Sequence, residues 1–174
     1  GQSAGSIATQ GFAVTNPEFF AAVASTSATP VPKDNPDSAS FDSVMVTETD
    51  PAYEMIPTML ISGQMDIGDL ALGFESSYLQ IWGNYMLQAN GIDAALESSS
   101  ANAVYAADSR HPEVYSWTRD FNGTEVPLVQ WSMCLLRPHN CYPSDMPILW
   151  DFLEHYSMDE NGTRYYSASA FELD

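Results

Sequence analysis

The chain has 174 residues, which suits one domain with a sizeable hydrophobic core and is too short for two ordinary domains. Hydrophobic residues make up 45% of it, which excludes a disordered protein, and no run of about 18 apolar residues exists to span a bilayer. Five basic against 23 acidic residues give a net charge of −18, which argues against nucleic acid or an anionic membrane as a partner.

The beginning of the chain predicts a helix followed by a buried strand. Small residues recur through residues 4–14, as in a helix that packs closely against a sheet, and Asn16 with Pro17 ends that helix. The short apolar stretch at residues 19–25 then indicates a buried strand.

A long segment without a regular pattern separates this strand from the next one. Residues 32–55 are rich in Pro, Asp and Ser, so we expect a surface loop or a lid insertion of the kind that covers a binding site. Residues 56–62 predict a second buried strand, which Gly63 closes.

A helix and a hairpin follow. Aromatic and apolar residues at helical spacing over residues 74–89 predict a helix, and Gly91 supplies its C-terminal stop. The segments 114–120 and 125–133 flank Asn122-Gly123, which is a strong signal for a two-residue hairpin turn.

The end of the chain predicts one more helix. Ser144 is a suitable N-cap for an amphipathic helix that carries Ile148, Leu149, Phe152, Leu153 and Tyr156. Residues 157–174 form either a loosely held tail or a final strand. Strands that alternate with helices predict that residues 1–174 are part of a single α/β domain with a largely parallel sheet, whose thinness suggests that a preceding part is missing.

The opening residues Gly1-Gln2-Ser3-Ala4-Gly5 match the Gly-x-Ser-x-Gly nucleophile elbow. A serine on a sharp strand-to-helix turn has strained dihedral angles, so its neighbours must be small. The following helix points its N-terminus at the site, and the Ala4 N–H can donate to a developing oxyanion. A close-packed turn without chemistry gives the same pattern, so the decision rests on a histidine and a carboxylate.

Three histidines compete for the role of the base that a serine nucleophile needs. His155 lies within the predicted last helix, where a solvated role is expected, and His111 begins a loop with little apolar context. His139 follows a strand end directly and precedes a helix, which is where an α/β hydrolase places its base. We therefore predict His139.

The carboxylate that orients the histidine is expected at the end of another strand. Asp66 follows the predicted strand at residues 56–62, and Asp69 is the alternative three residues later. The chain order Ser3, Asp66, His139 is that of α/β hydrolases and differs from the orders in chymotrypsin and subtilisin.

The two cysteines, Cys134 and Cys141, bracket His139. They form either a local disulfide, which would brace the histidine loop, or two unrelated thiols. A metal site would need more ligands at tighter spacing, so none is predicted. Two Asn-Gly-Thr sequons, at Asn122 and Asn161, fit a secreted or extracytoplasmic protein.

Three parts of the chain together resemble the polyhydroxybutyrate-depolymerase-like and feruloyl-esterase-like α/β hydrolases. They are the elbow with its helix and next strand (1–24), the acid-bearing strand (56–66), and the histidine loop with the last helix (131–153). The resemblance covers most of the chain, with residues 30–55 and the tail least alike. It implies an α/β-hydrolase fold and the hydrolysis of carboxylic esters, often plant cell-wall esters or polyesters, by secreted enzymes.

The sequence departs from that family in two ways. Gly5-Ser6 stands where members often have a Gly-Gly pair. The chain also begins inside the elbow, so we expect the preceding strands, and the loop with the second oxyanion amide, in an N-terminal half that this chain lacks.

The sequence therefore predicts a serine carboxylesterase that needs no cofactor and acts on a small or polymer-linked ester. A serine peptidase of the same fold and an inactive, truncated hydrolase remain alternatives. Tyr142, Trp131 and Trp150 could line an aromatic acyl site, although core packing explains them equally well.

Overall fold

A computed structural model describes residues 1–29, 56–66, 78–94 and 114–171 of the protein. The expected loop at residues 32–55 lies outside these ranges, as do Asp69, His111 and the first residues of the helix predicted over 74–89.

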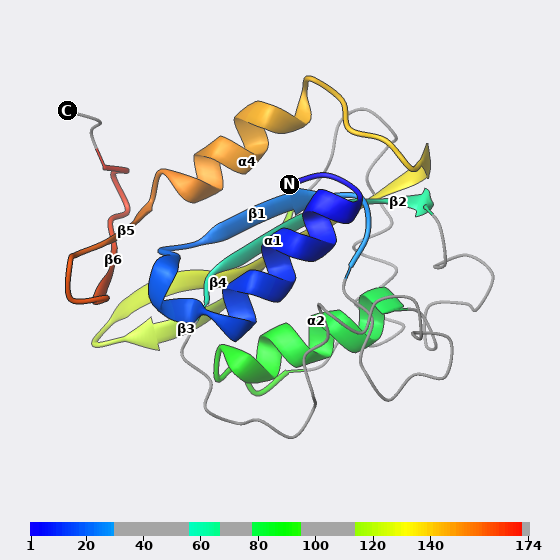
Figure 1. The fold of residues 1–174 in the computed structure, drawn as a ribbon. Coiled ribbons are helices and arrows are strands. Elements are labelled where there is room, and N and C mark those ends of the chain that lie inside the picture. The colour runs from blue at the N-terminus through cyan, green and yellow to red at the C-terminus, as the bar shows by residue number, and fades with distance from the viewer. Residues whose placement is uncertain (30–55, 67–77, 95–113, 172–174) are drawn as a thin grey trace.

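A four-stranded, mostly parallel sheet forms the middle of the molecule (Figure 1). Its order is β1 (Val23–Thr26), β2 (Thr58–Met65), β4 (Thr124–Pro138) and β3 (Tyr115–Phe121). The first three strands are parallel, and β3 pairs antiparallel with β4 at the edge. The prediction of an α/β protein with a largely parallel sheet is thus confirmed.

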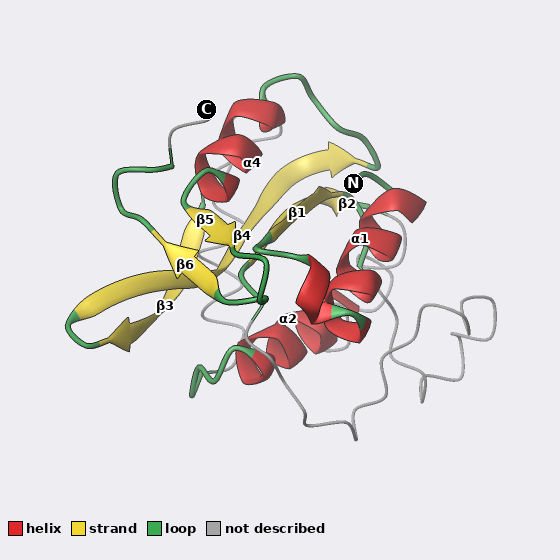
Figure 2. Cartoon of the chain, turned by 60° about the vertical axis from the view of Figure 1, so that its left-hand side comes forward, coloured by secondary structure: helices red, strands yellow, loops and turns green. Residues whose placement is uncertain are grey.

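Helices cover both faces of this sheet (Figures 1 and 2). On one face lie α1 (Ala4–Thr15) and α2 (Tyr78–Ala89), and on the other lies α4 (Asp145–Leu153). Each face has its own core of buried apolar side chains. The first core includes Ala13, Leu60, Trp82, Met86, Leu87 and Trp131, and the second includes Met59, Ile61, Leu128, Cys134, Leu149 and Phe152. The three layers place two cores on opposite sides of the parallel strands.

The antiparallel pairing of β3 with β4 confirms the predicted hairpin. Asn122 and Gly123 have φ angles of 56° and 88°, as a type I′ turn requires. A second hairpin of β5 (Tyr156–Met158) and β6 (Arg164–Tyr166) follows α4, so the end of the chain contains a final strand. The Tyr156 hydroxyl donates to the Pro127 carbonyl and ties this hairpin to β4.

Three element boundaries were predicted wrongly. The strand expected at residues 19–25 begins only at Val23, because Pro17–Phe19 forms a short 3-10 helix (η1). Gly63 lies inside β2 and does not close it. The last helix ends at Leu153, so Tyr156 belongs to β5.

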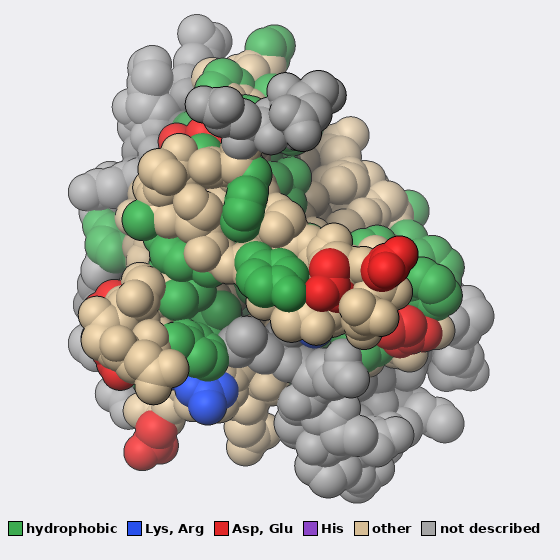
Figure 3. Space-filling model, turned by 90° about the vertical axis from the view of Figure 1, so that its left-hand side faces the viewer, with side chains coloured by type: hydrophobic (Ala, Val, Ile, Leu, Met, Phe, Trp, Pro, Cys, Tyr) green, Lys and Arg blue, Asp and Glu red, His purple; other side chains and the backbone are tan. Residues whose placement is uncertain are grey.

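The surface reflects the composition of the chain. On the face drawn in Figure 3, Asp and Glu side chains lie among hydrophobic and neutral ones, and Lys and Arg side chains are sparse. Among the helices of the described residues, none combines the length and the apolar character that a membrane crossing needs.

Candidate active site

The elbow around Ser3 is built as a strand-to-helix turn. Gln2 pairs in parallel with Thr26 at the end of β1, and α1 begins directly after Ser3. Ser3 itself has φ 58° and ψ −126°, a conformation that is uncommon for a residue with a side chain. Its N–H donates to the carbonyl oxygens of Thr26 and Ser27 at 3.2 and 3.0 Å. The turn is therefore fixed by the neighbouring strand and by the loop after it.

The structure leaves room for a side chain at only one of the two glycines of the motif. A Cβ atom at Gly1 would lie 2.2 Å from the Gly5 carbonyl oxygen, so the turn cannot accommodate a side chain there. A Cβ atom at Gly5 would meet nothing within 4 Å in the described part of the chain. The expectation that the elbow needs small neighbours is therefore confirmed at Gly1. At Gly5 it is wrong, because there is room for a side chain.

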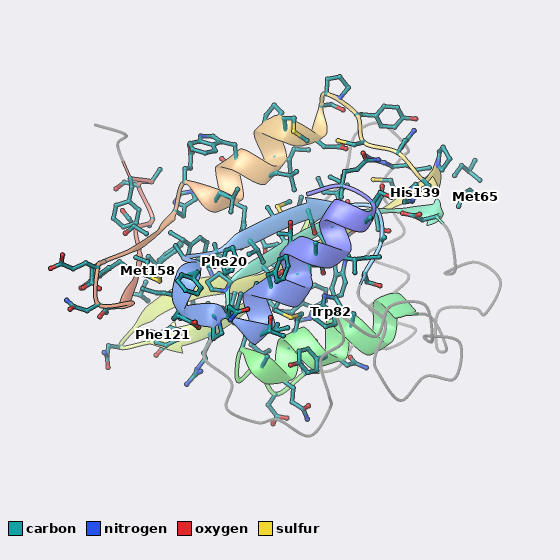
Figure 4. The ribbon with its side chains drawn as sticks, viewed as in Figure 1. Phe20, Met65, Trp82, Phe121, His139 and Met158 are labelled. Atoms are coloured by element: carbon teal, nitrogen blue, oxygen red, sulfur yellow. The ribbon has the colours of Figure 1, made fainter. Side chains whose placement is uncertain are left out.

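His139 follows β4 and reaches the elbow across the sheet. Gln2, which pairs with the end of β1, is separated from β4 by β1 and β2, which amounts to about 14 Å at three strand spacings. The loop after β4 crosses this distance, and the Nε2 atom of His139 lies 2.7 Å from the Ser3 Oγ. Figure 4 shows His139 beside Met65 at one end of the sheet, with Phe121 at the other end.

Asp66 completes the arrangement from the end of β2. Its Oδ1 lies 2.5 Å from Nδ1 of His139, and its side chain is 1% exposed against 27% for the histidine. The Ser62 hydroxyl donates to the other carboxylate oxygen at 3.5 Å. With Nδ1–H donated to the carboxylate, the Nε2 lone pair faces the serine hydroxyl, which is the orientation a general base needs.

A bulge in β4 directs His139 towards β2. Gly63 pairs with Cys134 and Met65 pairs with Pro138, so one residue of β2 faces three of β4. Leu136 in the bulge has a positive φ of 54°. A Cβ atom at Gly63 would lie 2.2 Å from the Arg137 carbonyl oxygen, so β2 and the bulge approach closely only because residue 63 is glycine.

The Ala4 N–H is positioned to stabilise negative charge near Ser3. As the first residue of α1, Ala4 has no intrahelical acceptor for its N–H, and no group in the described residues accepts it. The positive end of the helix dipole adds to this donor. The predicted oxyanion donor is therefore available beside the serine.

All three side chains thus leave the carboxyl edge of one parallel sheet, which is where open α/β sheets bind ligands. Comparisons of the chain with protein-family models, with curated proteins and with solved structures found no match. The assignment of the site therefore depends on its geometry.

For Trp131, the structure agrees with core packing, which is one of the two alternatives for the three aromatic residues. Trp131 is 2% exposed and packs in the core beneath α1 and α2. The Tyr142 ring lies under the Arg137 guanidinium at 4.8 Å. Trp150 is half exposed on α4 and lines a hollow with Gly1 and Gln2, so its contact with a substrate stays a prediction.

The cysteines are two free thiols, so the disulfide alternative is not formed. Cys134 points into the core between the sheet and α4, where its sulfur accepts from Arg137 at 3.6 Å. Cys141 lies in the loop, and its sulfur donates to the Tyr142 carbonyl. Burial raises the pKa of the Cys134 thiol, and the hydrogen bond from Arg137 offsets this only in part.

A cluster of three side chains that could hold a metal ion lies away from this site. Ligand atoms of Asp151, Glu154 and His155 lie within 4.8 Å of one another at the C-terminal end of α4, whereas His139 precedes its N-terminal end. The Nδ1 atom of His155 is hydrogen bonded to the Ser167 carbonyl oxygen at 2.6 Å. His155 therefore lies just beyond the helix in which it was predicted, and it is half-buried.

Sequence reasoning missed the residues that hold the site together. Ser62 and Ser27 carry no local signal, since serines are frequent in this chain. Arg137 had one signal: it is among only five basic residues and stands two positions before His139. A cation so close to the predicted base, in a chain this poor in cations, indicates a specific partner.

Proposed function

We propose that the protein is a serine carboxylic-ester hydrolase in which Ser3 is the nucleophile, His139 the base and Asp66 the orienting acid. The observation that carries this proposal is the continuous hydrogen-bonded chain from Ser3 Oγ through both nitrogens of His139 to Asp66, at 2.7 and 2.5 Å. The strained dihedrals of Ser3 at the start of α1 support it, because they expose the hydroxyl on a rigid turn.

In the acylation step, His139 Nε2 takes the proton of the Ser3 hydroxyl while Oγ attacks the ester carbonyl carbon. The carbonyl oxygen becomes an oxyanion, to which the Ala4 N–H donates. Asp66 stabilises the imidazolium that forms and keeps the ring in its orientation. The imidazolium then gives its proton to the leaving alkoxide, so that an alcohol departs and an acyl-serine remains.

Deacylation repeats the same steps with water. His139 takes a proton from a water molecule that attacks the acyl carbon, and the second oxyanion occupies the same position. When it collapses, the Ser3 oxygen leaves with the proton from His139, and a carboxylic acid is released. Apart from the ester and this water molecule, both steps use only groups of the protein.

The arrangement of the elements supports an α/β-hydrolase fold for this site. The acid follows β2 and the histidine follows β4, which are neighbouring parallel strands, and the serine follows Gln2, which pairs in parallel with the end of β1. The chain order of the three residues is that of the family. Esters of the cell-wall or polyester type, outside the cytoplasm, are the substrates we propose from the resemblance. The sequon residues Asn122 and Asn161 are both exposed, as glycosylation would require.

Turnover of p-nitrophenyl acetate by the purified protein and by Ser3→Ala tests the proposal. We expect wild-type turnover and a fall in kcat on the order of 10⁶-fold in the variant. A folded protein whose turnover survives Ser3→Ala would contradict it. A preference for a peptide anilide over the ester would replace the esterase by a peptidase with the same three residues.

A further inference from the structure

A completely buried ion pair lies in the loop that carries His139. Arg137 and Asp145 are both 0% exposed, and the guanidinium contacts the carboxylate with two parallel hydrogen bonds, one of them 2.9 Å from Nη1 to Oδ1. The Tyr142 N–H also donates to Asp145, at 2.9 Å. Burial alone would lower the pKa of the Arg137 guanidinium, but its bonds to Asp145 outweigh burial and raise it. The guanidinium therefore stays charged.

The Arg137 guanidinium also binds the far side of the loop that carries His139. Its Nε atom donates to the Asn140 side-chain oxygen, and its Nη2 atom donates to the Asn140 carbonyl, both at 3.2 Å. The Tyr142 ring packs against its face. His139 lies within the segment that these contacts enclose, so its backbone is fixed on both sides by Arg137.

The same loop is linked to the nucleophile elbow through Ser27. The Ser27 hydroxyl donates to the Asn140 carbonyl at 2.6 Å, and the Ser27 carbonyl accepts from the Ser3 N–H at 3.0 Å. Ser27 is fully buried and has a positive φ of 56°. One residue thus contacts the backbone of the turn that carries the serine and the loop that carries the histidine.

We propose that the Arg137–Asp145 pair and Ser27 form a positioning clamp that holds the His139 imidazole against Ser3, an inference that rests on the proposed function. A buried ion pair is a poor device for stability, since apolar residues of similar volume often serve as well or better. The fork of the guanidinium instead fixes direction as well as distance. Loss of the clamp therefore moves the His139 imidazole away from Ser3, although the imidazole itself is still present.

The double variant Arg137→Met with Asp145→Leu tests the clamp, because it removes both charges and leaves none unpaired. Two quantities are measured. One is the far-downfield proton resonance of His139 Nδ1–H, assigned by its absence in His139→Gln, which reports the ring position without catalysis. The other is the turnover of p-nitrophenyl acetate, with kcat and KM separated. Leu128→Ala, a cavity in the core behind the sheet, is the control for destabilisation alone.

We expect the double variant to fold, to lose or shift the resonance, and to lose about 100-fold in kcat with KM little changed, as a displacement of about 1 Å would produce. Leu128→Ala should melt earlier and keep the resonance. A folded double variant with the wild-type resonance and kcat overturns the clamp. If the double variant does not fold, Ser27→Ala decides by the same two readouts, with an unchanged resonance and kcat again overturning it.

The two proposals fail in different ways. If the wild-type protein shows the resonance but hydrolyses no ester, the proposed function fails, and the resonance in the variants alone decides the clamp. If the wild-type protein and the double variant hydrolyse the ester equally, the esterase proposal stands and the clamp fails.

Discussion

Substitution of Gly63 by alanine is the sharpest perturbation that the structure offers. The added Cβ atom would lie 2.2 Å from the Arg137 carbonyl oxygen, where an ordinary van der Waals contact begins at 3.4 Å. The difference is 1.2 Å, and the clashing atoms are backbone atoms that cannot rotate away. The ends of β2 and β4 must therefore separate by about 1 Å to admit one methyl group.

That separation acts directly on the hydrogen bond between Asp66 and His139. Asp66 lies three residues after Gly63, and His139 lies two residues after Arg137, so the two side chains move apart with their strands. A misplacement of about 1 Å costs about 100-fold in rate. Overpacking of this kind costs about 1–3 kcal/mol of stability, so we expect a folded variant.

The assay compares Gly63→Ala with the wild-type protein in turnover of p-nitrophenyl acetate and in thermal unfolding. Gly5→Ala is the matched control for stability, because it adds the same methyl group to open space in a helix and should leave the melting temperature unchanged or raise it. A Gly63→Ala protein that melts like the wild type and keeps its full kcat would refute the reasoning, since the close approach of the two strands would then not matter.

Three further predictions follow from individual contacts. Asp66→Asn should keep the fold but reduce kcat on the order of 10⁴-fold, because the amide favours the wrong imidazole tautomer; a smaller effect than tenfold in steady-state kinetics would remove Asp66 from its role. With a thiol reagent at mildly alkaline pH, Cys141 should react quickly and Cys134 only after unfolding, since burial raises the pKa of the Cys134 thiol and keeps it protonated. If the reagent finds no free thiol even after unfolding, the two cysteines form a disulfide instead. Tyr156→Phe should lower the free energy of unfolding in denaturant titrations by about 0.5–1.5 kcal/mol through loss of the bond to Pro127, and an unchanged stability would contradict that bond.

The features that the sequence predicted correctly have local causes. The turn at Asn122-Gly123 needs a positive φ angle at two successive residues. The Asn-Gly pair is strongly preferred in such turns, so it identifies the hairpin from the sequence alone. The helix after Ser3 follows from its run of small residues and from the Asn16-Pro17 stop. The positions of Asp66 and His139 follow from apolar stretches that end in a polar residue. Parallel strands bring such ends to one edge, so the pattern also indicated which side chains meet.

The errors concern contacts between segments far apart in the chain. The sequence predicts that Gly63 closes a strand, whereas its role depends on the carbonyl of Arg137, 74 positions away. Trp131 could not be assigned to core or site, since only the packing of α1 and α2 against the sheet buries it. The spacing of Cys134 and Cys141 allowed a disulfide, but β4 turns Cys134 into the core behind the sheet.

The central claim is that the Ser3 hydroxyl is an activated nucleophile. Incubation with a fluorophosphonate, followed by peptide mass mapping, tests it most directly, because the serine oxygen must displace fluoride from phosphorus while His139 takes its proton. The account predicts one label per chain, on Ser3, with labelling abolished in His139→Gln although that variant is folded. A folded wild-type protein that takes no label, or takes it on another serine, would contradict the account.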